Sequence, residues 1–164
     1  METLKKIKIN IGAGNNHLKT FINIDINPDK KPDIVADCRD LPFKDNSVDE
    51  IYCGHLLEHL TIENFNNTIK EMHRVLKAGG KITITIPDLV RAIDGYKKHK
   101  IEWALIQLIC FGDEPKPEFG HKIVLNDKVL MNSLKPYFKD LKLVFCSNLA
   151  SNIAFWQSII EGYK

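Results

Sequence analysis

The sequence predicts an α/β protein whose mostly parallel sheet ends in an antiparallel hairpin. Strand and helix signals alternate along most of the chain, which is typical of βα units with parallel strands. The last two strand signals are separated by a short polar turn, so the final pair should leave one antiparallel strand at the edge of the sheet. A chain of 164 residues has room for one such domain and not for two full cores.

The predicted strands are short runs of apolar and β-branched residues bounded by turn residues. The first carries isoleucines at alternate positions and runs directly into a Gly-x-Gly turn. The fifth is followed by Pro87, which lacks the N–H that would continue a ladder. These five strands are expected over residues 7–11, 21–25, 33–36, 48–52 and 81–86.

Two helical patterns flank the fifth strand. Apolar residues recur at steps of three and four from Ile62 to Leu76, and the glycines at 79 and 80 are expected to end that helix. Residues 88–111 also have a helical pattern, and residues 103–110 are apolar on nearly all sides. A helix of this kind is buried, or it covers a site or a partner.

The C-terminal third adds a loop, a helix and the hairpin. Residues 112–122 are rich in proline and glycine, which predicts a loop. Asp127 is expected to cap a helix with apolar residues as far as Phe138. The hairpin strands are expected over residues 141–146 and 152–160.

Polar residues follow three successive strands. Gly12 and Gly14 come after the first strand, Asp25 ends the second, and Asp37 follows the third. Ligands of open α/β sheets bind outside the carboxyl ends of the strands, so we expect a small-molecule site there. Only 13 positions separate Gly12 from Asp25, against about 20 in the dinucleotide fingerprint. The spacing disfavours a nicotinamide or flavin site, and it predicts that the helix between the first two strands is short or missing.

The charge, the N-terminus and the cysteines indicate which partners and which cell compartment to expect. The net charge is +2 and 27% of residues are charged, so no strong field favours nucleic acid, and no nucleic-acid partner is expected. The N-terminus lacks a secretion pattern, and no apolar run reaches the ~18 residues of a membrane span. The four cysteines, at positions 38, 53, 110 and 146, form no C-x-x-C pair. We therefore expect a reduced, cytoplasmic protein without membrane insertion or a cysteine zinc site.

Five motifs, taken in order, resemble the class I S-adenosylmethionine-dependent methyltransferases. They lie at residues 9–14 (Ile-Asn-Ile-Gly-Ala-Gly), 25, 36–43, 49–60 and 71–80. The chain is most similar to small predicted methyltransferases with a Leu-Glu-His signature. The resemblance implies a Rossmann-like, doubly wound sheet in a single domain over residues 1–164. The cofactor-binding half would span residues 7–90, and an acceptor-side helix, loop and hairpin would span residues 91–164.

The resemblance also implies S-adenosylmethionine as cofactor, S-adenosylhomocysteine as product, and roles for matching positions. The Gly-x-Gly backbone would face the methionine end, Asp25 would accept hydrogen bonds from the ribose, and Asp37 would meet the adenine amino group. The positions implied for the cofactor are Gly12, Ala13, Gly14, Asn15, Asp25, Ile26, Asp37, Cys38, Cys53 and Gly54.

Three histidines are candidate catalytic residues. Methyl transfer needs alignment of acceptor, methyl and sulfur, and a hydroxyl acceptor also needs a base, which histidine provides near neutral pH. The candidates are His55, His59 and His121. Residues 52–55 lack the Asn/Asp-Pro-Pro-aromatic sequence of amino-methylating nucleic-acid enzymes. We therefore expect O-methylation of a small-molecule or sugar-type acceptor, with no metal.

Two alternatives stay open. The chain could be a S-adenosylmethionine-binding module with little catalysis of its own, acting with a partner protein or as a homodimer through apolar residues 101–111. It could also be a zinc hydrolase, because His55, Glu58 and His59 match the H-x-x-E-H pattern. That pattern needs a regular helix that puts both imidazoles on one face.

Overall fold

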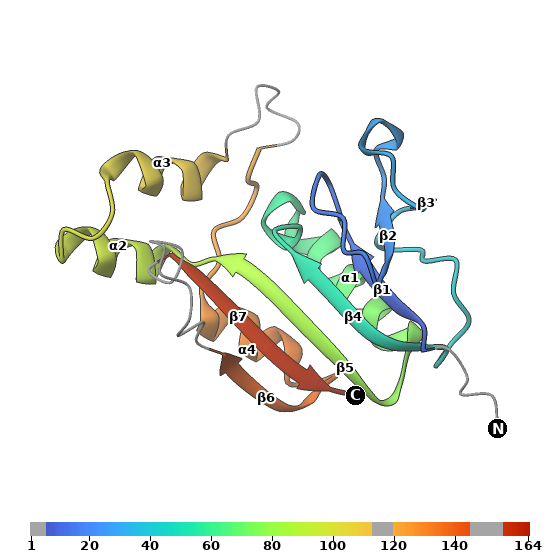
Figure 1. Cartoon of the computed structure of the whole chain (residues 1–164). Helices are drawn as coiled ribbons and strands as arrows, with labels where there is room; N and C mark the ends of the chain where they lie inside the picture. Colours follow the sequence, from blue (N-terminus) through green and yellow to red (C-terminus); the bar gives the residue numbers. More distant parts are fainter. Residues whose placement is uncertain (1–5, 113–119, 145–155) are drawn as a thin grey trace.

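The computed structural model describes residues 6–112, 120–144 and 156–164. These residues form one seven-stranded sheet of order β3-β2-β1-β4-β5-β7-β6 (Figure 1). The first five strands pair in parallel, and β7 runs antiparallel to both of its neighbours. The strands are β1 (Lys8–Ile11), β2 (Ile22–Asp25), β3 (Ile34–Val35), β4 (Val48–Gly54), β5 (Leu76–Pro87), β6 (Lys139–Val144) and β7 (Gln157–Tyr163).

The C-terminal antiparallel pair is confirmed, but the predicted place of its antiparallel strand is wrong. β7 lies between β5 and β6, so β6 forms the edge of the sheet. The reason is that β7 is buried at alternate positions, including Ile160, which lies opposite Ile84 of β5. Residues 145–155, which hold parts of both predicted strands and Cys146, lie outside the described residues.

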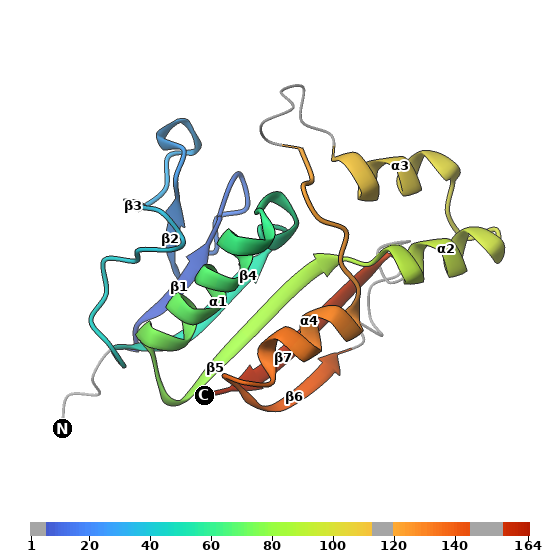
Figure 2. The same ribbon diagram turned by 180° about the vertical axis from the view of Figure 1, so that it is seen from behind.

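Within the described ranges, four helices accompany the sheet. Helices α1 and α4 lie on the same face (Figure 2), while α2 and α3 pack on each other beyond the carboxyl end of β5. Short 3₁₀ turns lie at η1 (Pro28–Lys30) and η2 (Leu57–His59). The helices are α1 (Ile62–Val75), α2 (Leu89–Lys97), α3 (Trp103–Phe111) and α4 (Asp127–Leu134).

Three predicted helix boundaries are corrected. Helix α1 ends at Val75, because Leu76 is already extended and pairs with Val48, so the two glycines lie inside β5. The helical pattern of residues 88–111 is interrupted between α2 and α3. Asn126 caps α4 in place of the predicted Asp127, because the Asn126 side chain accepts a hydrogen bond from the Val129 N–H at 2.9 Å.

The two faces of the sheet differ in chemistry. Isoleucines such as Ile9, Ile51 and Ile82 are fully buried in one apolar cluster with residues of α1 and α4, the helices that cover one face of the sheet. The alternating positions carry charges on the opposite face. There Lys8 Nζ lies 2.6 Å from Glu50 Oε2, and a second such ion pair follows on β5 and β7. The covered face is therefore the hydrophobic core, and the other is polar.

The connection from β1 to β2 contains no helix, as its length predicted. Buried asparagine side chains hold it in place. Asn10 Nδ2 donates to the Asn16 carbonyl at 2.9 Å and to Asn23 Oδ1 at 3.0 Å. Asn23 Oδ1 also accepts from the Leu18 N–H at 2.8 Å, and its Nδ2 donates to Asp33 Oδ2 at 2.9 Å. These bonds satisfy backbone groups that a helix would otherwise pair.

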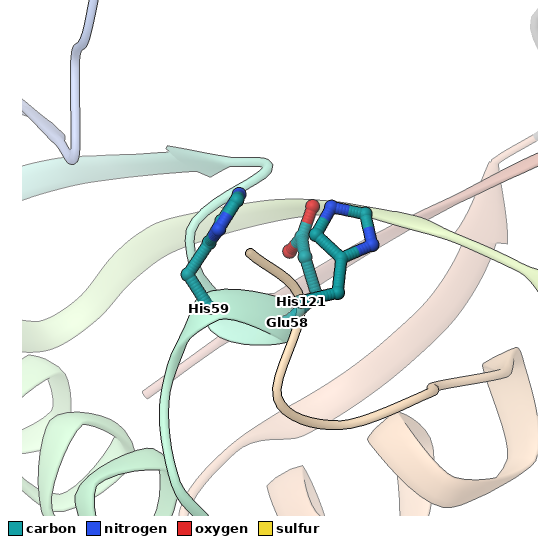
Figure 3. A group of neighbouring side chains, drawn as sticks. All are labelled: Glu58, His59 and His121. Carbon is teal, nitrogen blue, oxygen red and sulfur yellow. The ribbon is translucent and has the colours of Figure 1, made fainter. Parts of the chain in front are cut away.

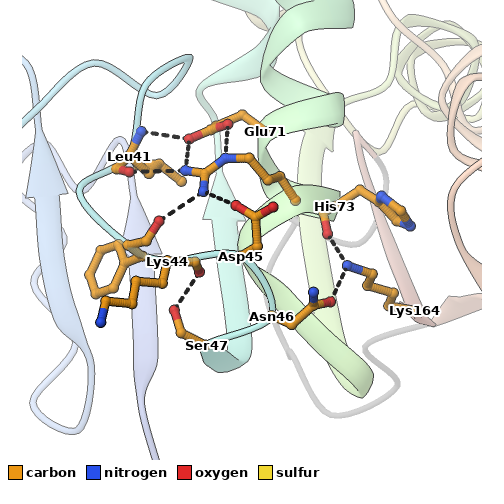
Figure 4. A network of polar contacts seen from close by, with 10 residues as sticks. Leu41, Lys44, Asp45, Asn46, Ser47, Glu71, His73 and Lys164 are labelled. Carbon is orange, nitrogen blue, oxygen red and sulfur yellow. Dashed lines mark hydrogen bonds and ion pairs between the residues drawn. The ribbon is translucent and has the colours of Figure 1, made fainter.

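The connection from β3 to β4, residues 36–47, also lacks a helix and is fastened to α1 by Arg74. The Arg74 guanidinium donates to both carboxylate oxygens of Glu71, at 2.6 and 2.8 Å, and to Asp45 Oδ1 at 2.6 Å. Glu71 in turn accepts from the Leu41 N–H at 2.7 Å (Figure 4). Burial alone would raise the pKa of Glu71, but these donors hold it below its ordinary value.

Among the described residues, no helix combines the length and the apolar character that crossing a membrane requires.

Candidate active site

Two cavities open at the carboxyl ends of the parallel strands, on either side of residues 55–60. The first, called here the strand-end cavity, measures about 200 Å³. The second, called the histidine cavity, measures about 330 Å³. The strand-end cavity is lined by Ile11, Gly12, Ile24, Asp25, Ile26, Ala36, Asp37, Cys38, Arg39, Leu56, Leu60 and Asn64. The histidine cavity is lined by His55, Glu58, His59, Pro87, Leu108, Ile109, Gly112, His121, Trp156 and Gln157.

Half of the residues predicted to bind the cofactor line the strand-end cavity. They are Gly12, Asp25, Ile26, Asp37 and Cys38. The other predicted positions, Ala13, Gly14, Asn15, Cys53 and Gly54, do not line it.

Two of these positions, Cys53 and Gly14, lie outside the cavity lining for different reasons. The Cys53 thiol is fully buried in the core, and this burial raises its pKa well above the ordinary value. Its side chain therefore packs as an apolar group. Gly14 supports the cavity from outside, because its N–H donates to Asp25 Oδ2 at 2.7 Å.

Asp25 is fixed at the end of β2 by two backbone donors. One carboxylate oxygen accepts from Gly14, and Oδ1 accepts from the Asn27 N–H at 2.9 Å. An ionised carboxylate has about four acceptor positions, so each oxygen can still accept a hydrogen bond from a ligand hydroxyl. Gly12 and Gly14 make the turn above it with φ values of 66° and 50°, which glycine adopts without strain.

Asp37 is held by a residue that sequence reasoning missed. Arg39 donates to Asp37 through its backbone N–H at 2.8 Å and its Nε at 2.9 Å, and its side chain continues to Asn64 Oδ1 at 2.9 Å. Chiefly because of the Arg39 side-chain hydrogen bond, the pKa of Asp37 lies below its ordinary value. Arg39 thus bounds the cavity between β3 and α1. Its place two residues after Asp37 was the available signal.

Two leucines of the segment 55–60, which lies between the two cavities, were also not predicted as site residues. Leu56 and Leu60 turn toward the strand-end cavity, while His55, Glu58 and His59 turn toward the histidine cavity. The Leu56 side chain covers Gly12 so closely that a Cβ at position 12 would lie 2.9 Å from it.

All three predicted catalytic histidines line the histidine cavity. Both ring nitrogens of His55 are engaged: Nδ1 lies 3.2 Å from Glu58 Oε1, and Nε2 lies 2.9 Å from Gln157 Nε2. The consistent tautomer places the proton on Nδ1, with Gln157 donating to Nε2. His55 also has a left-handed φ of 54°, and its N–H donates to the Thr85 carbonyl at 2.9 Å.

His121 reaches the cavity because its loop is fastened to two elements. Its N–H donates to the Phe111 carbonyl at 3.2 Å, and the Lys122 N–H donates to the Glu58 carbonyl at 2.8 Å. His121 Nδ1 lies 2.7 Å from the Ile109 carbonyl, so Nδ1 carries the proton and Nε2 is the acceptor nitrogen. The His59 and His121 rings meet edge to face with centroids 4.8 Å apart.

Glu58 lies between these histidines (Figure 3). Its side chain is 1% exposed, and Oε1 contacts His55. Among the described residues, the buried Oε2 has no hydrogen-bond donor. One ligand atom from each of Glu58, His59 and His121 lies within 4.8 Å of the others.

The zinc-hydrolase alternative lacks its required helix. Only residues 57–59 of the H-x-x-E-H segment form a turn, and this turn is 3₁₀. The two imidazoles of His55 and His59 are therefore not presented four residues apart on one helical face.

Gln157 and Trp156 are functional candidates that the sequence did not reveal. They lie at the start of β7, about 100 residues from His55, and no local pattern marks them. Asp88 does not line either cavity: it caps α2 through the Arg91 N–H at 3.1 Å and accepts from Ser158 Oγ at 2.7 Å.

Residues 12–84 match the family model described as "Methyltransferase domain". A sterol 4-C-methyltransferase of Caenorhabditis elegans is 36% identical over 80 residues, which cover 49% of this chain and 22% of that protein. An uncharacterized protein of Methanocaldococcus jannaschii is 37% identical over 57 residues, or 35% of this chain and 24% of that protein. The matches thus span less than a quarter of these curated relatives.

Solved structures share the fold. A SAM-dependent methyltransferase from Archaeoglobus fulgidus superimposes with a TM-score of 0.67 at 17% identity, covering 97% of this chain and 86% of that chain. A putative methyltransferase in complex with the Trm112 methyltransferase activator from Haloferax volcanii gives 0.63 at 13% identity, covering 97% and 82%.

Proposed function

We propose that the chain is a class I S-adenosylmethionine-dependent methyltransferase that methylates a hydroxyl oxygen of a small-molecule or sugar-type acceptor; the family-model match over residues 12–84 and the fold shared with solved SAM-dependent methyltransferases support this. One observation carries the proposal: neighbouring residues of the segment 55–60 line both cavities, Leu56 and Leu60 the strand-end cavity and His55, Glu58 and His59 the histidine cavity. A cofactor in the strand-end cavity can therefore present its reactive end to an acceptor in the histidine cavity. The histidine cavity alone, at about 330 Å³, falls within the ~300–1,000 Å³ of small-molecule sites.

The residues of the strand-end cavity fit S-adenosylmethionine. The Asp25 carboxylate has acceptor positions for two ribose hydroxyls, and Asp37 can accept from the adenine amino group. Ile26, which is 64% exposed, and Leu60 offer apolar surface to the base. Gly12 lines the same cavity and adds no side chain to it.

The sulfonium of the bound cofactor supplies an electrophilic methyl group. The acceptor hydroxyl gives its proton to a base, and an oxygen lone pair forms the new carbon–oxygen bond. The carbon–sulfur pair stays on sulfur, so S-adenosylhomocysteine leaves. His121 Nε2 is suited to take the proton, because the Ile109 carbonyl fixes the proton of its ring on Nδ1.

A partner protein or a second copy of the chain is a further candidate feature. Helix α3 exposes Trp103 by 55% and Phe111 by 73%, although its Ile106 and Ile109 are buried. Exposed aromatic residues on one short helix favour an interface. Size-exclusion chromatography with light scattering of the wild-type chain and of Phe111→Ser tests this directly.

The test of the proposed function compares Asp25→Ala with Asp29→Ala, an exposed acidic control. S-adenosylmethionine should raise the melting temperature of the wild-type chain. Loss of both ribose contacts should weaken binding by at least about 30-fold, near 2 kcal/mol, in calorimetric titrations of Asp25→Ala. The control should bind as the wild-type chain does.

Equal affinity in the two variants would contradict the ribose assignment. Formation of S-adenosylhomocysteine, measured with hydroxyl and amine acceptors, tests the acceptor atom, and turnover with amines alone would contradict O-methylation.

A further inference from the structure

We propose that Glu58, His59 and His121 bind a divalent first-row transition-metal ion at the wall of the histidine cavity. One carboxylate and two imidazoles form a ligand set that zinc and iron(II) accept, with further coordination positions left for water or substrate. The sequence did not predict this set, because His121 is separated from the other two ligands by more than 60 residues.

The first argument is the state of the Glu58 carboxylate. The side chain is almost fully buried, Oε1 is used by His55, and Oε2 has no donor among the described residues. Buried polar atoms are nearly always paired, and an orphaned one points to an ion or water at the site. The Glu58 carboxylate lies between the two imidazoles in Figure 3, and one of its oxygens lies within 4.8 Å of a ring nitrogen of each.

The second argument is the tautomer of His121. Its Nδ1–H is directed to the Ile109 carbonyl at 2.7 Å, which leaves the Nε2 lone pair for the cluster. Metal-binding histidines usually donate their second ring N–H in this way, and the partner fixes both the tautomer and the ring orientation. The hydrogen bonds at Phe111 and Glu58 hold the loop that carries this ring.

The third argument is distance. The three ligand atoms lie within 4.8 Å of one another. Two ligands that each bond zinc at about 2.1 Å can be at most about 4.2 Å apart. Closing the cluster on an ion thus needs adjustments on the order of an ångström.

The metal site would make the acceptor of the proposed methyl transfer more specific, and this part of the inference rests on the proposed function. An ion beside the acceptor would bind the hydroxyl oxygen and lower its pKa, so that the proton leaves more readily. With the ion bound, His121 Nε2 is a ligand and no longer the base named above, so His55 is the imidazole left to take that proton. Rotation of the Gln157 amide would turn its oxygen toward the protonated Nε2. The predicted acceptor class is therefore a hydroxyl compound that can coordinate a divalent cation.

The test uses Co²⁺ as a visible probe on the full chain, freed of its affinity tag and treated with a chelator. We expect one equivalent of Co²⁺ to give ligand-field absorption bands that Zn²⁺ abolishes by displacement. His59→Ala, His121→Ala and Glu58→Gln should each weaken Co²⁺ binding by at least about tenfold. His99→Asn is the matched control, because His99 is exposed and its φ of 54° suits asparagine.

Circular dichroism confirms the fold of each variant, and Glu58→Gln keeps the buried side chain in place if an alanine variant unfolds. Absence of a stoichiometric band, or equal affinity in Glu58→Gln and His99→Asn, would overturn the metal site. The S-adenosylmethionine-dependent melting shift is recorded on the same samples. A shift without Co²⁺ binding overturns the metal site alone, whereas Co²⁺ binding without a shift supports the metal site and overturns the proposed function.

Discussion

The strand-end cavity and the histidine cavity are built in different ways. Every lining residue of the strand-end cavity lies between Ile11 and Asn64, and most follow directly from three neighbouring strand ends. The histidine cavity instead joins η2, the ends of α3 and β5, the loop of His121 and the start of β7. A site made from consecutive strand ends can be located from sequence, whereas a site assembled across a hundred residues requires the tertiary structure.

The largest effect is expected from Arg74→Ala, which tests how the connection between β3 and β4, on the side of the strand-end cavity, is held in place. The substitution removes the guanidinium that pairs with the nearly buried Glu71 carboxylate. It also releases the connection between β3 and β4 from helix α1. Breaking such a pair costs about 3–5 kcal/mol when both charges are buried. Because Arg74 is about one-third exposed, we expect about 2–3 kcal/mol in urea denaturation.

Lys98→Ala is the control, since it breaks an exposed i,i+4 pair with Asp94, and it should leave the urea denaturation midpoint almost unchanged. Equal losses in the two variants would show that Arg74 does not anchor the connection.

A smaller effect is expected from Gly12→Ala, which tests how closely Leu56 packs against the glycine turn. The added methyl group would lie 2.9 Å from Leu56, at a backbone φ of 66°. The left-handed φ alone costs about 1–2 kcal/mol. We expect roughly tenfold weaker S-adenosylmethionine binding in calorimetric titrations.

The double variant Gly12→Ala/Leu56→Ala separates the two causes, because it removes the contact and keeps the backbone strain. Partial recovery of affinity relative to Gly12→Ala is expected. No recovery would mean that Leu56 does not restrict position 12.

The smallest effect concerns pH and the other helix-free connection. Hydrogen bonds from the Asn23 backbone N–H and side chain lower the pKa of Asp33 from its ordinary value of 3.8. A carboxyl with a lowered folded-state pKa contributes stability above its unfolded pKa, and this contribution is lost as the pH falls through the folded value. The exposed position of Asp33 limits the contribution to about 0.5–1 kcal/mol.

Asp33→Asn should lose that amount at pH 7 and should lose less than the wild-type chain on acidification below pH ~4. Urea denaturation at several pH values measures both. Parallel pH curves for the two proteins would rule out this role for Asp33.

Much of the fold could be predicted because it depends on local signals. Alternating isoleucines, the Gly-x-Gly turn and the short spacing to Asp25 predicted the parallel strands and the missing helix between β1 and β2. The boundary at Val75 could not be predicted, since pairing of Leu76 with Val48 overrides the glycine signal at 79 and 80. The internal position of β7 depends on long-range pairing for the same reason.

The residues of the candidate site also differ in whether a local sequence signal marks them. Asp25 and Asp37 follow strand ends, a local signal that predicts their place at the strand-end cavity, and His55, His59 and His121, predicted from their side-chain chemistry, line one cavity. Gln157 carries no local signal, and its contact with His55 spans 102 residues. The roles of Arg39 and Leu56 depend on side-chain directions, which the residue types alone do not specify.

The most direct test is a crystal structure of the chain with S-adenosylhomocysteine. We predict the ribose on Asp25, the adenine beside Asp37 and Ile26, and the sulfur at residues 54–56, facing the histidine cavity. A ligand seated in the strand-end cavity with its sulfur turned away from His55 and His121, or bound elsewhere on the chain, would contradict the proposed arrangement of cofactor and acceptor.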